Sequence, residues 1–204
     1  AATAPGDAGM AGAIAARRTH RGPFRDEPVA PGLLARMAAA AAAEGAGLEM
    51  VDDPERRRAL ADLVDEGDRA QFADPRWRRE LAAWMHPRRR GDGLAVPLLA
   101  LGPTKLAVRG MDLGPRTGAK DAALLMDAPG VAVLHTPGDA PADWLGAGQA
   151  LQAALLVAAA EGVQAGYLNQ PCQVESLRPR LAELLGVRGA HPQVVVRIGR
   201  PDGD

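Results

Sequence analysis

The sequence predicts one domain of mixed helices and strands in which helix dominates. Several stretches combine a capping residue, an early proline and apolar residues at helical spacing, whereas others are short apolar runs bounded by turn residues. At 204 residues the chain is long enough for one substantial core. Its residues are 47% apolar but only 3% aromatic, so Ala, Leu and Val must form that core. We expect a single domain over residues 9–201, a linker over 1–8 and a tail over 202–204.

In the first half of the chain the helix starts carry the clearest signals. Asp53 is followed by Pro54, which is typical of a helix start because an Asp side chain accepts hydrogen bonds from the free N–H groups of the first turn. Pro31 fits the first turn of the preceding helix, and Gly45 ends it. The expected elements are helices over 9–17, 32–44, from 54 onward and over 75–85, and a strand over 48–51.

The second half is predicted to alternate irregular stretches, helices and strands. Residues 88–115 are rich in Gly and Pro and are expected to be irregular, as a lid or a surface excursion. Asp143 is expected to cap a long helix over 144–161 that is apolar nearly all round, which favours a place in the domain centre or in a dimer interface. The remaining expected elements are a helix over 120–126, a buried strand over 130–135, a loop over 166–171, a helix capped by Ser176 and ending at Gly186, and a strand over 193–199.

A basic cluster at residues 17–21 is the most distinctive polar feature. Arg17, Arg18 and Arg21 place three guanidinium groups around the Thr19 hydroxyl, in a chain whose net charge is only -1. Guanidinium groups match phosphate oxygens with paired hydrogen bonds, so the cluster predicts a cradle for a phosphorylated ligand. The alternative is a solvated helix end, where the helix dipole favours cations.

Charge and cysteine content exclude several classes of protein. Binding to a nucleic-acid backbone needs a broad basic face, so no nucleic-acid partner is expected. Cys172 is the only cysteine, which fits a reducing cytoplasm, and we expect it to serve in packing. No cationic start precedes a long apolar stretch, and the longest such stretch contains Gln149 and Gln152, so neither a signal peptide nor a membrane span is expected.

Three segments in their order and spacing resemble the nitroreductase superfamily of flavin enzymes. They are residues 17–21, residues 147–150 leading to 168–171, and residues 194–201. More closely, the chain is similar to the C-terminal unit of the Acg-type proteins, in which two such units are fused, and its start without methionine agrees with a processed product or a segment of a longer polypeptide. The resemblance covers most of residues 10–201. It implies an α+β nitroreductase-like fold, with an antiparallel-rich central sheet flanked by helices and a long central helix.

The resemblance implies FMN as the cofactor. In the family an Arg-x-Ser-x-Arg/Lys segment holds the phosphate, the ribityl chain and the pyrimidine edge, and the loop after the central helix faces flavin N5 and O4. A basic pair beyond the last strand often completes the phosphate site, and in this sequence Arg200 is the candidate to substitute for that pair. The residues that these patterns assign to FMN are Arg17, Arg18, Thr19, Arg21, Asn169, Gln170 and Arg200.

The implied reaction is NAD(P)H-dependent. A nicotinamide reduces the flavin at N5, and the flavin then reduces a nitroaromatic or quinone-type acceptor, with no catalytic side chain required. The resemblance also implies a homodimer or a pseudo-dimer with an upstream unit, with the helix from Trp144 at the interface. No metal is expected, because the histidines lack metal-ligand spacing. They are His20, His86, His135 and His191.

Two departures from the family leave other functions open. The family's Pro-Ser-x-x-Asn-type segment is replaced by residues 38–47, which carry no comparable donors, and in the fused branch that segment belongs to the first unit. Alternation along the last strand places Arg197 and Arg200 on opposite faces, so we do not expect the two arginines to bind the same phosphate. The alternatives are a flavin-sequestering protein with little turnover and a half-unit that completes a partner's flavin site.

The carboxylates between residues 62 and 68 complete the candidate list. Asp62, Asp65, Glu66 and Asp68 resemble paired catalytic acids in composition. We interpret them as the solvated face of the helix that starts at Pro54, with no acid–base role.

Overall fold

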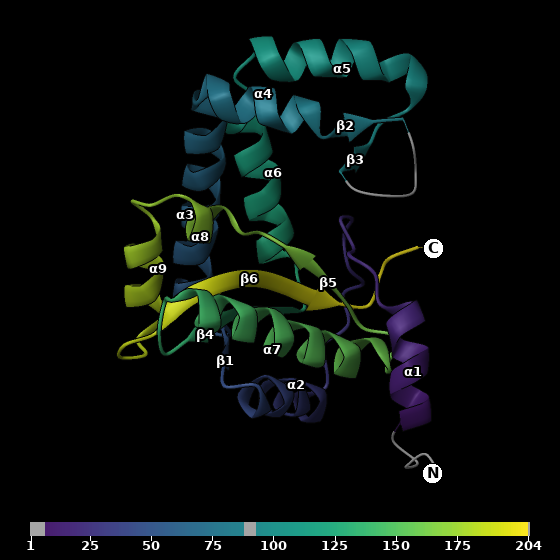
Figure 1. The fold of residues 1–204 in the computed structure, drawn as a ribbon, viewed down its shortest axis with the longest axis vertical. Helices are drawn as coiled ribbons and strands as arrows, with labels where there is room; N and C mark the ends of the chain where they lie inside the picture. Colours follow the sequence, from purple (N-terminus) through teal and green to yellow (C-terminus); the bar gives the residue numbers. More distant parts are fainter. Residues whose placement is uncertain (1–6, 88–92, 204) are drawn as a thin grey trace.

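In the computed structural model, which describes residues 7–87 and 93–203, a four-stranded sheet separates two layers of helices (Figure 1). Its strands are β1 (Gly47–Met50), β4 (Gly130–Thr136), β6 (His191–Gly199) and β5 (Gln164–Tyr167), in the order β1-β4-β6-β5. All three pairings are antiparallel. The structure therefore confirms the expected antiparallel sheet flanked by helices.

One face of the sheet is covered by α2 (Pro31–Ala43) and α7 (Pro141–Ala159). Helix α7 buries Ala147, Ala150 and Ala154 and exposes Leu145, so within this chain it is apolar on both sides but covered on only one. The helix begins earlier than expected: its N-cap residue is Ala140, and Asp143 accepts the Ala140 N–H from the third helical position at 2.9 Å. Small alanine side chains allow this close helix–sheet packing.

The opposite face is covered by α3 (Pro54–Ala73), α6 (Gly114–Met126), α8 (Gln170–Gln173) and α9 (Arg178–Leu185). The predicted cap of α3 is confirmed, because Asp53 Oδ1 accepts the Arg56 N–H at 2.8 Å. The predicted end at Gly186 is also confirmed, with φ of 66° in the left-handed region that glycine favours. Ser176 does not cap α9, whose N-cap residue is Leu177.

The prediction of an irregular segment over 88–115 is wrong where the structure describes it. Helix α5 (Leu98–Gly110) lies there, and α6 begins at Gly114 rather than Lys120. Together with α4 (Pro75–Ala83), β2 (Met85–His86) and β3 (Leu94–Ala95), α5 forms an arm beyond the ends of α3 and α6 (Figure 1). Residues 88–92 of the predicted segment lie outside the described part of the chain.

The helix α5 forms despite an internal proline. Pro103 removes one N–H from the helix interior, which is why its sequence suggested a break. Leu99, one turn earlier, is 95% exposed, so water can reach the carbonyl group that loses its partner. Packing of Val108 against Ala82 and Met85 supplies a small separate core that holds the helix in place.

Residues 24–25 pair with residues 200–201 at one side of the sheet. After α1 (Asp7–Ala16) the chain passes along β5, and Phe24 forms an antiparallel bridge with Pro201. The Arg25 N–H donates to the Arg200 carbonyl at 2.9 Å. Among the described residues no helix is both long and apolar enough to cross a bilayer.

Candidate functional site

The basic cluster is held against strand β5 by its backbone. Thr19 forms a parallel bridge with Ala165, and the His20 N–H donates to the Ala165 carbonyl at 2.9 Å. The Arg18 N–H donates to Gln164 Oε1 at 2.8 Å. The segment thus adds a short edge to the sheet, and its position is fixed by residues at the far end of the sequence.

A cavity of about 280 Å³ opens between this segment, α6 and the edge of the sheet. It brings together side chains from four elements that are distant in the sequence. Its lining residues are Thr19, His20, Arg21, Lys120, Asp121, Leu124, Tyr167, Leu168 and Arg197. With Arg21, Lys120 and Arg197 against Asp121, positive charge predominates, so the cavity favours an anion.

Arg197 lies at the inner wall of the cavity and is only 2% exposed. Its Nη2 donates to the His20 carbonyl at 3.1 Å, and its guanidinium carbon lies 4.7 Å from the centroid of the Phe24 ring. Its Nη1 is buried without a hydrogen-bond partner among the described residues. Burial lowers the Arg197 pKa and the nearby Asp121 opposes that shift, but a guanidinium remains charged at neutral pH.

Gly166 makes room for this arginine. A Cβ atom at position 166 would lie 2.5 Å from the His20 carbonyl oxygen and 2.9 Å from Arg197 Nε. These distances are shorter than ordinary contacts, so only glycine fits between the basic segment and Arg197. The basic segment, Gly166 and the Arg197 side chain therefore pack directly on one another, which explains how a cation becomes buried at the edge of the sheet.

Behind the cavity, the Gln170 side chain bridges two carboxylates. Its Nε2 donates to Asp68 Oδ2 and to Asp121 Oδ2, each at 3.1 Å, while its Oε1 is buried without a partner among the described residues. Burial, with the charges of Asp121 and Asp65, raises the pKa of Asp68 to about 7 against the opposing Gln170 hydrogen bond. Burial also raises the pKa of Asp121, against the Gln170 hydrogen bond and the charges of Lys120 and Arg197. We call these three residues the carboxylate bridge.

The structure brings some of the predicted site residues together and leaves others apart. Thr19 and Arg21 line the cavity, and Gln170 contacts its wall through Asp121. Asn169 faces the sheet, where its Oδ1 accepts the Val195 N–H at 2.9 Å. Five of the seven predicted residues are absent from the cavity lining, namely Asn169, Gln170, Arg17, Arg18 and Arg200. Arg200 instead donates to the Glu161 carbonyl at 2.9 Å and lies 3.8 Å from Glu27.

Sequence reasoning missed Lys120, Asp121 and Arg197 as site residues, and it placed Asp68 wrongly. Asp68 is 3% exposed and lies on the side of α3 that contacts Gln170 at the start of α8, not on a solvated face. In a helix with many charged residues, nothing in the sequence distinguishes a single buried acid from its exposed neighbours. The alternation that separates Arg197 from Arg200 was a usable signal, since in the structure only Arg197 of the two lines the cavity beside α6.

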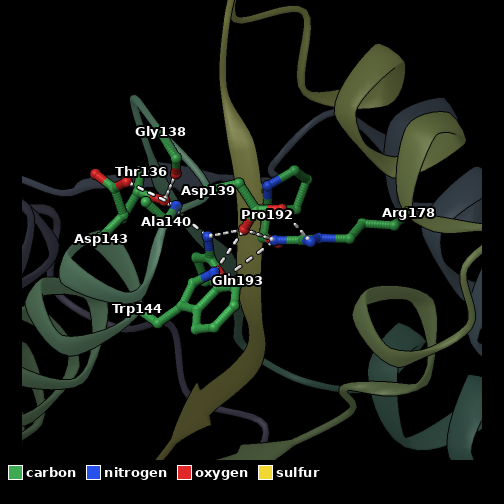
Figure 2. Close-up of polar contacts among 9 residues, drawn as sticks. All are labelled: Thr136, Gly138, Asp139, Ala140, Asp143, Trp144, Arg178, Pro192 and Gln193. Carbon is green, nitrogen blue, oxygen red and sulfur yellow. Dashed lines mark hydrogen bonds and ion pairs between the residues drawn. The ribbon is translucent and has the colours of Figure 1, made fainter.

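A second polar cluster lies at the start of β6 (Figure 2). Asp139 accepts two hydrogen bonds from Arg178, at 2.7 and 2.8 Å, and one from Trp144 Nε1 at 2.7 Å. Gln193 Nε2 donates to Asp139 at 3.2 Å and to Thr136 Oγ1 at 2.8 Å. The Arg178 and Trp144 hydrogen bonds hold the pKa of Asp139 well below its usual range. We call this group the Asp139 cluster.

Other reactive side chains give no site. Burial raises the pKa of Cys172 to about 12, so it stays a thiol, packed against the core between the sheet and the helices α3, α6 and α9. No group of three His, Cys, Asp or Glu side chains within residues 7–87 and 93–203 is arranged to hold a metal ion.

Comparison with known proteins gives agreement in sequence and in fold. The model of the "Nitroreductase family" matches residues 14–200. The chain is 30% identical over 198 residues to "Putative NAD(P)H nitroreductase Rv3131" of Mycobacterium tuberculosis, an alignment that covers 95% of this chain and 56% of the relative. The chain therefore spans about half the length of the curated relatives that it matches.

Solved structures show the same fold at low identity. An iodotyrosine deiodinase bound to FMN and 3-iodo-L-tyrosine superposes with a TM-score of 0.60 at 13% identity, covering 95% of this chain and 90% of that one. A nitroreductase with bound FMN from Desulfitobacterium hafniense superposes with a TM-score of 0.55 at 16% identity, covering 96% and 90%.

Proposed function

The chain belongs to the nitroreductase family, and on this premise we propose that it binds FMN and acts as an NAD(P)H-dependent oxidoreductase. Electrons would pass through flavin N5 to nitroaromatic or quinone-type acceptors. The relatives named as NAD(P)H nitroreductases and the FMN-bound structures of the same fold support this proposal.

The unpaired guanidinium nitrogen of Arg197 is the observation that carries the proposal. Buried polar groups are nearly always paired, so a cation in the cavity wall that keeps one buried donor unpaired indicates an anionic or strongly accepting ligand nearby. Thr19, Arg21 and Lys120 add a hydroxyl and two positive charges to the same cavity. FMN offers a phosphate and a polar pyrimidine edge, so this donor set fits it.

In this proposal the cavity residues bind and orient the cofactor. Thr19, Arg21, Lys120 and Arg197 would hold its anionic or polar groups. The segment 168–170 would orient the ring, and it is well fixed for that role because the Leu168 N–H donates to the Val195 carbonyl at 3.0 Å. FMN, when bound, supplies a hydride acceptor at N5.

The remaining predicted contacts stay predictions. Arg17, Arg18 and Arg200 do not line the cavity of this chain, and Asn169 is engaged with β6. We propose that any role of these arginines in holding FMN requires the assembled site described next.

We propose that this single flavin-binding domain over residues 9–201 is the C-terminal unit of an Acg-type fused protein. The cavity volume of about 280 Å³ lies just under the range of about 300–1,000 Å³ that is usual for ligand pockets. An upstream unit or a second copy would supply the missing wall. Helix α7 supports such an assembly, since Trp144 and Leu145 are 53% and 74% exposed.

The second candidate function is flavin sequestration with little turnover. It is favoured by the same pair of observations, an anchoring arginine together with an incomplete cavity. Such a protein would hold FMN firmly without admitting NAD(P)H and an acceptor in turn.

Spectroscopy and turnover assays separate these functions. The purified chain is mixed with FMN, and the visible flavin absorbance is recorded with and without NADPH and a nitroaromatic or quinone acceptor. Bound flavin with NADPH oxidation supports the oxidoreductase, and bound flavin without oxidation supports sequestration. The proposal is wrong if FMN does not bind to the chain, either alone or mixed with the upstream half of the fused relative.

A further inference from the structure

The carboxylate bridge is built by close packing of two helices, α6 and α8, on α3. A Cβ at Gly67 would lie 2.6 Å from Gln170 Cβ, so the start of α8 rests directly on α3. A Cβ at Gly118 would lie 2.3 Å from Asp65 Oδ1 and 2.8 Å from the Asp65 carbonyl oxygen, so α6 approaches α3 equally closely. These two glycines bring Asp68, Asp121 and Gln170 within hydrogen-bond reach.

The bridge leaves negative charge without full compensation. Gln170 is neutral, so its amide joins the two acids but cancels no charge. Asp121 has the cations Lys120 and Arg197 near it, whereas the charged groups that face Asp68 are Asp121 from α6 and Asp65 from its own helix. A buried carboxylate beside like charges prefers the protonated form, and of the two acids Asp68 has the weaker compensation.

The bridge communicates with the cavity through shared cations. Lys120 and Arg197 line the cavity, and both favour the charged form of Asp121. An anion that binds there competes with Asp121 for the positive charge of Lys120 and Arg197. Losing that compensation makes protonation of the bridge more favourable.

We propose that Asp68 and Asp121, joined by Gln170, form a site for one exchangeable proton behind the cavity, and that binding of a phosphate-bearing anion increases the occupancy of this site. The coupling to FMN rests on the proposed function, whereas the stored proton does not. Asp68 and Gln170 are positioning residues here, acting on the ligand through Asp121 and Arg197.

Equilibrium linkage fixes the sign of the effect. If anion binding takes up a proton, lower pH must strengthen anion binding. Uptake of one full proton changes the dissociation constant by up to about tenfold per pH unit. The FMN phosphate titrates in the opposite sense, because its own protonation at a pKa of about 6 reduces its charge, so wild type must be compared with a variant.

The stored proton is tested by urea unfolding between pH 5 and pH 8 for wild type, Asp68→Asn and Asp62→Asn. Asn mimics the protonated acid, and Asp62 is an exposed carboxylate on the same helix. Because the Asp68 pKa is raised on folding, the contribution of Asp68 to wild-type stability falls as pH rises from about 4 toward 7. We expect the advantage of Asp68→Asn over wild type in urea midpoint to be small at pH 5 and to grow up to pH 8, whereas Asp62→Asn follows wild type throughout.

The coupling is tested by calorimetric titration with FMN in buffers of different ionisation enthalpy at pH 7.5. On binding FMN, wild type should take up more protons than Asp68→Asn, and the difference should be a large fraction of one proton per FMN. The wild-type dissociation constant should rise more steeply between pH 6.5 and pH 8. If Asp68→Asn fails to fold, proton uptake by the wild-type protein, compared with that of free FMN, decides the question.

Each contrary result has a distinct meaning. Parallel pH dependence of unfolding in wild type and Asp68→Asn overturns the stored proton. FMN binding with equal proton uptake in both proteins overturns the coupling alone. Absence of FMN binding contradicts the proposed function and the coupling together, while the unfolding titration still decides whether the proton is stored.

Discussion

Strand β6 carries a polar cluster near each end, and the two clusters differ in how completely they are paired. In the Asp139 cluster each carboxylate oxygen receives at least one charged donor, and the side chains around it donate to one another (Figure 2). Around Arg197, by contrast, a guanidinium nitrogen and the Gln170 Oε1 are buried without partners among the described residues. A fully paired cluster stabilises the fold by itself, whereas an incompletely paired one gains its missing partners from a ligand or a proton.

Removing the central arginine of each cluster should give opposite results. Arg197→Met should weaken FMN binding about 30-fold or more, about 2 kcal/mol, because a buried charged donor is lost. Arg178→Met should leave FMN affinity unchanged but lower the free energy of unfolding by about 2 kcal/mol, because two charge-assisted hydrogen bonds disappear. Flavin titration and urea unfolding on both variants measure this, with Arg188→Met as an exposed control. The comparison fails if both variants change the same property.

Gly166→Ala should affect both binding and stability. The new Cβ would press on the His20 carbonyl and on Arg197, which we expect to cost about 1–3 kcal/mol of folding free energy and to displace the basic segment from the cavity. Gly148→Ala is the matched control, since a Cβ there meets nothing within 4 Å and alanine favours a helix by up to about 1 kcal/mol. A Gly166→Ala protein with normal stability and FMN affinity would show that Arg197 is not held by this contact.

Asp139→Asn tests the sign of the pH dependence. The Asp139 pKa is lowered on folding, so its contribution is present above the unfolded pKa of about 4 and is lost as pH falls below it. We expect a loss of about 1–2 kcal/mol at pH 7 that shrinks at pH 3, measured by urea unfolding at both values. Asp68→Asn should change in the opposite sense: its free energy of unfolding relative to that of wild type should increase as pH rises. A loss from Asp139→Asn that is equal at both pH values would contradict this view of the cluster.

Trp144→Phe should have the smallest effect. It removes only the indole N–H donor to Asp139, because Arg178 and Gln193 still bind that carboxylate. We expect a loss of about 0.5–1 kcal/mol in the free energy of unfolding and no change in flavin binding. If Trp144 instead lies in a contact with a second unit, the variant will also change the sedimentation of the protein.

The sequence was informative where a single residue determines local backbone structure. Asp53 with Pro54 and the glycine at 186 act within one helical turn, and both ends were predicted correctly. The same local reasoning failed at Pro103, because packing of α5 against α4 and β2 outweighs one missing hydrogen bond.

The candidate site was predicted only in part, for a physical reason. The basic segment is contiguous, so its arginines are visible in the sequence, but which of them face a cavity depends on the path along β5. Asp68, Asp121 and Arg197 lie on three different elements, and only the packing at Gly67, Gly118 and Gly166 brings them together. The likeness to the family pointed to the cofactor but not to these residues.

The hydrogen bond from Arg197 to the His20 carbonyl joins positions that are 177 residues apart. Closing so long a loop is entropically costly and is slow compared with forming local contacts. The two helical layers can pack around β4 before these two positions meet. Binding competence should therefore be acquired late in folding, and the appearance of a flavin signal would report completion of the native state rather than collapse of its core.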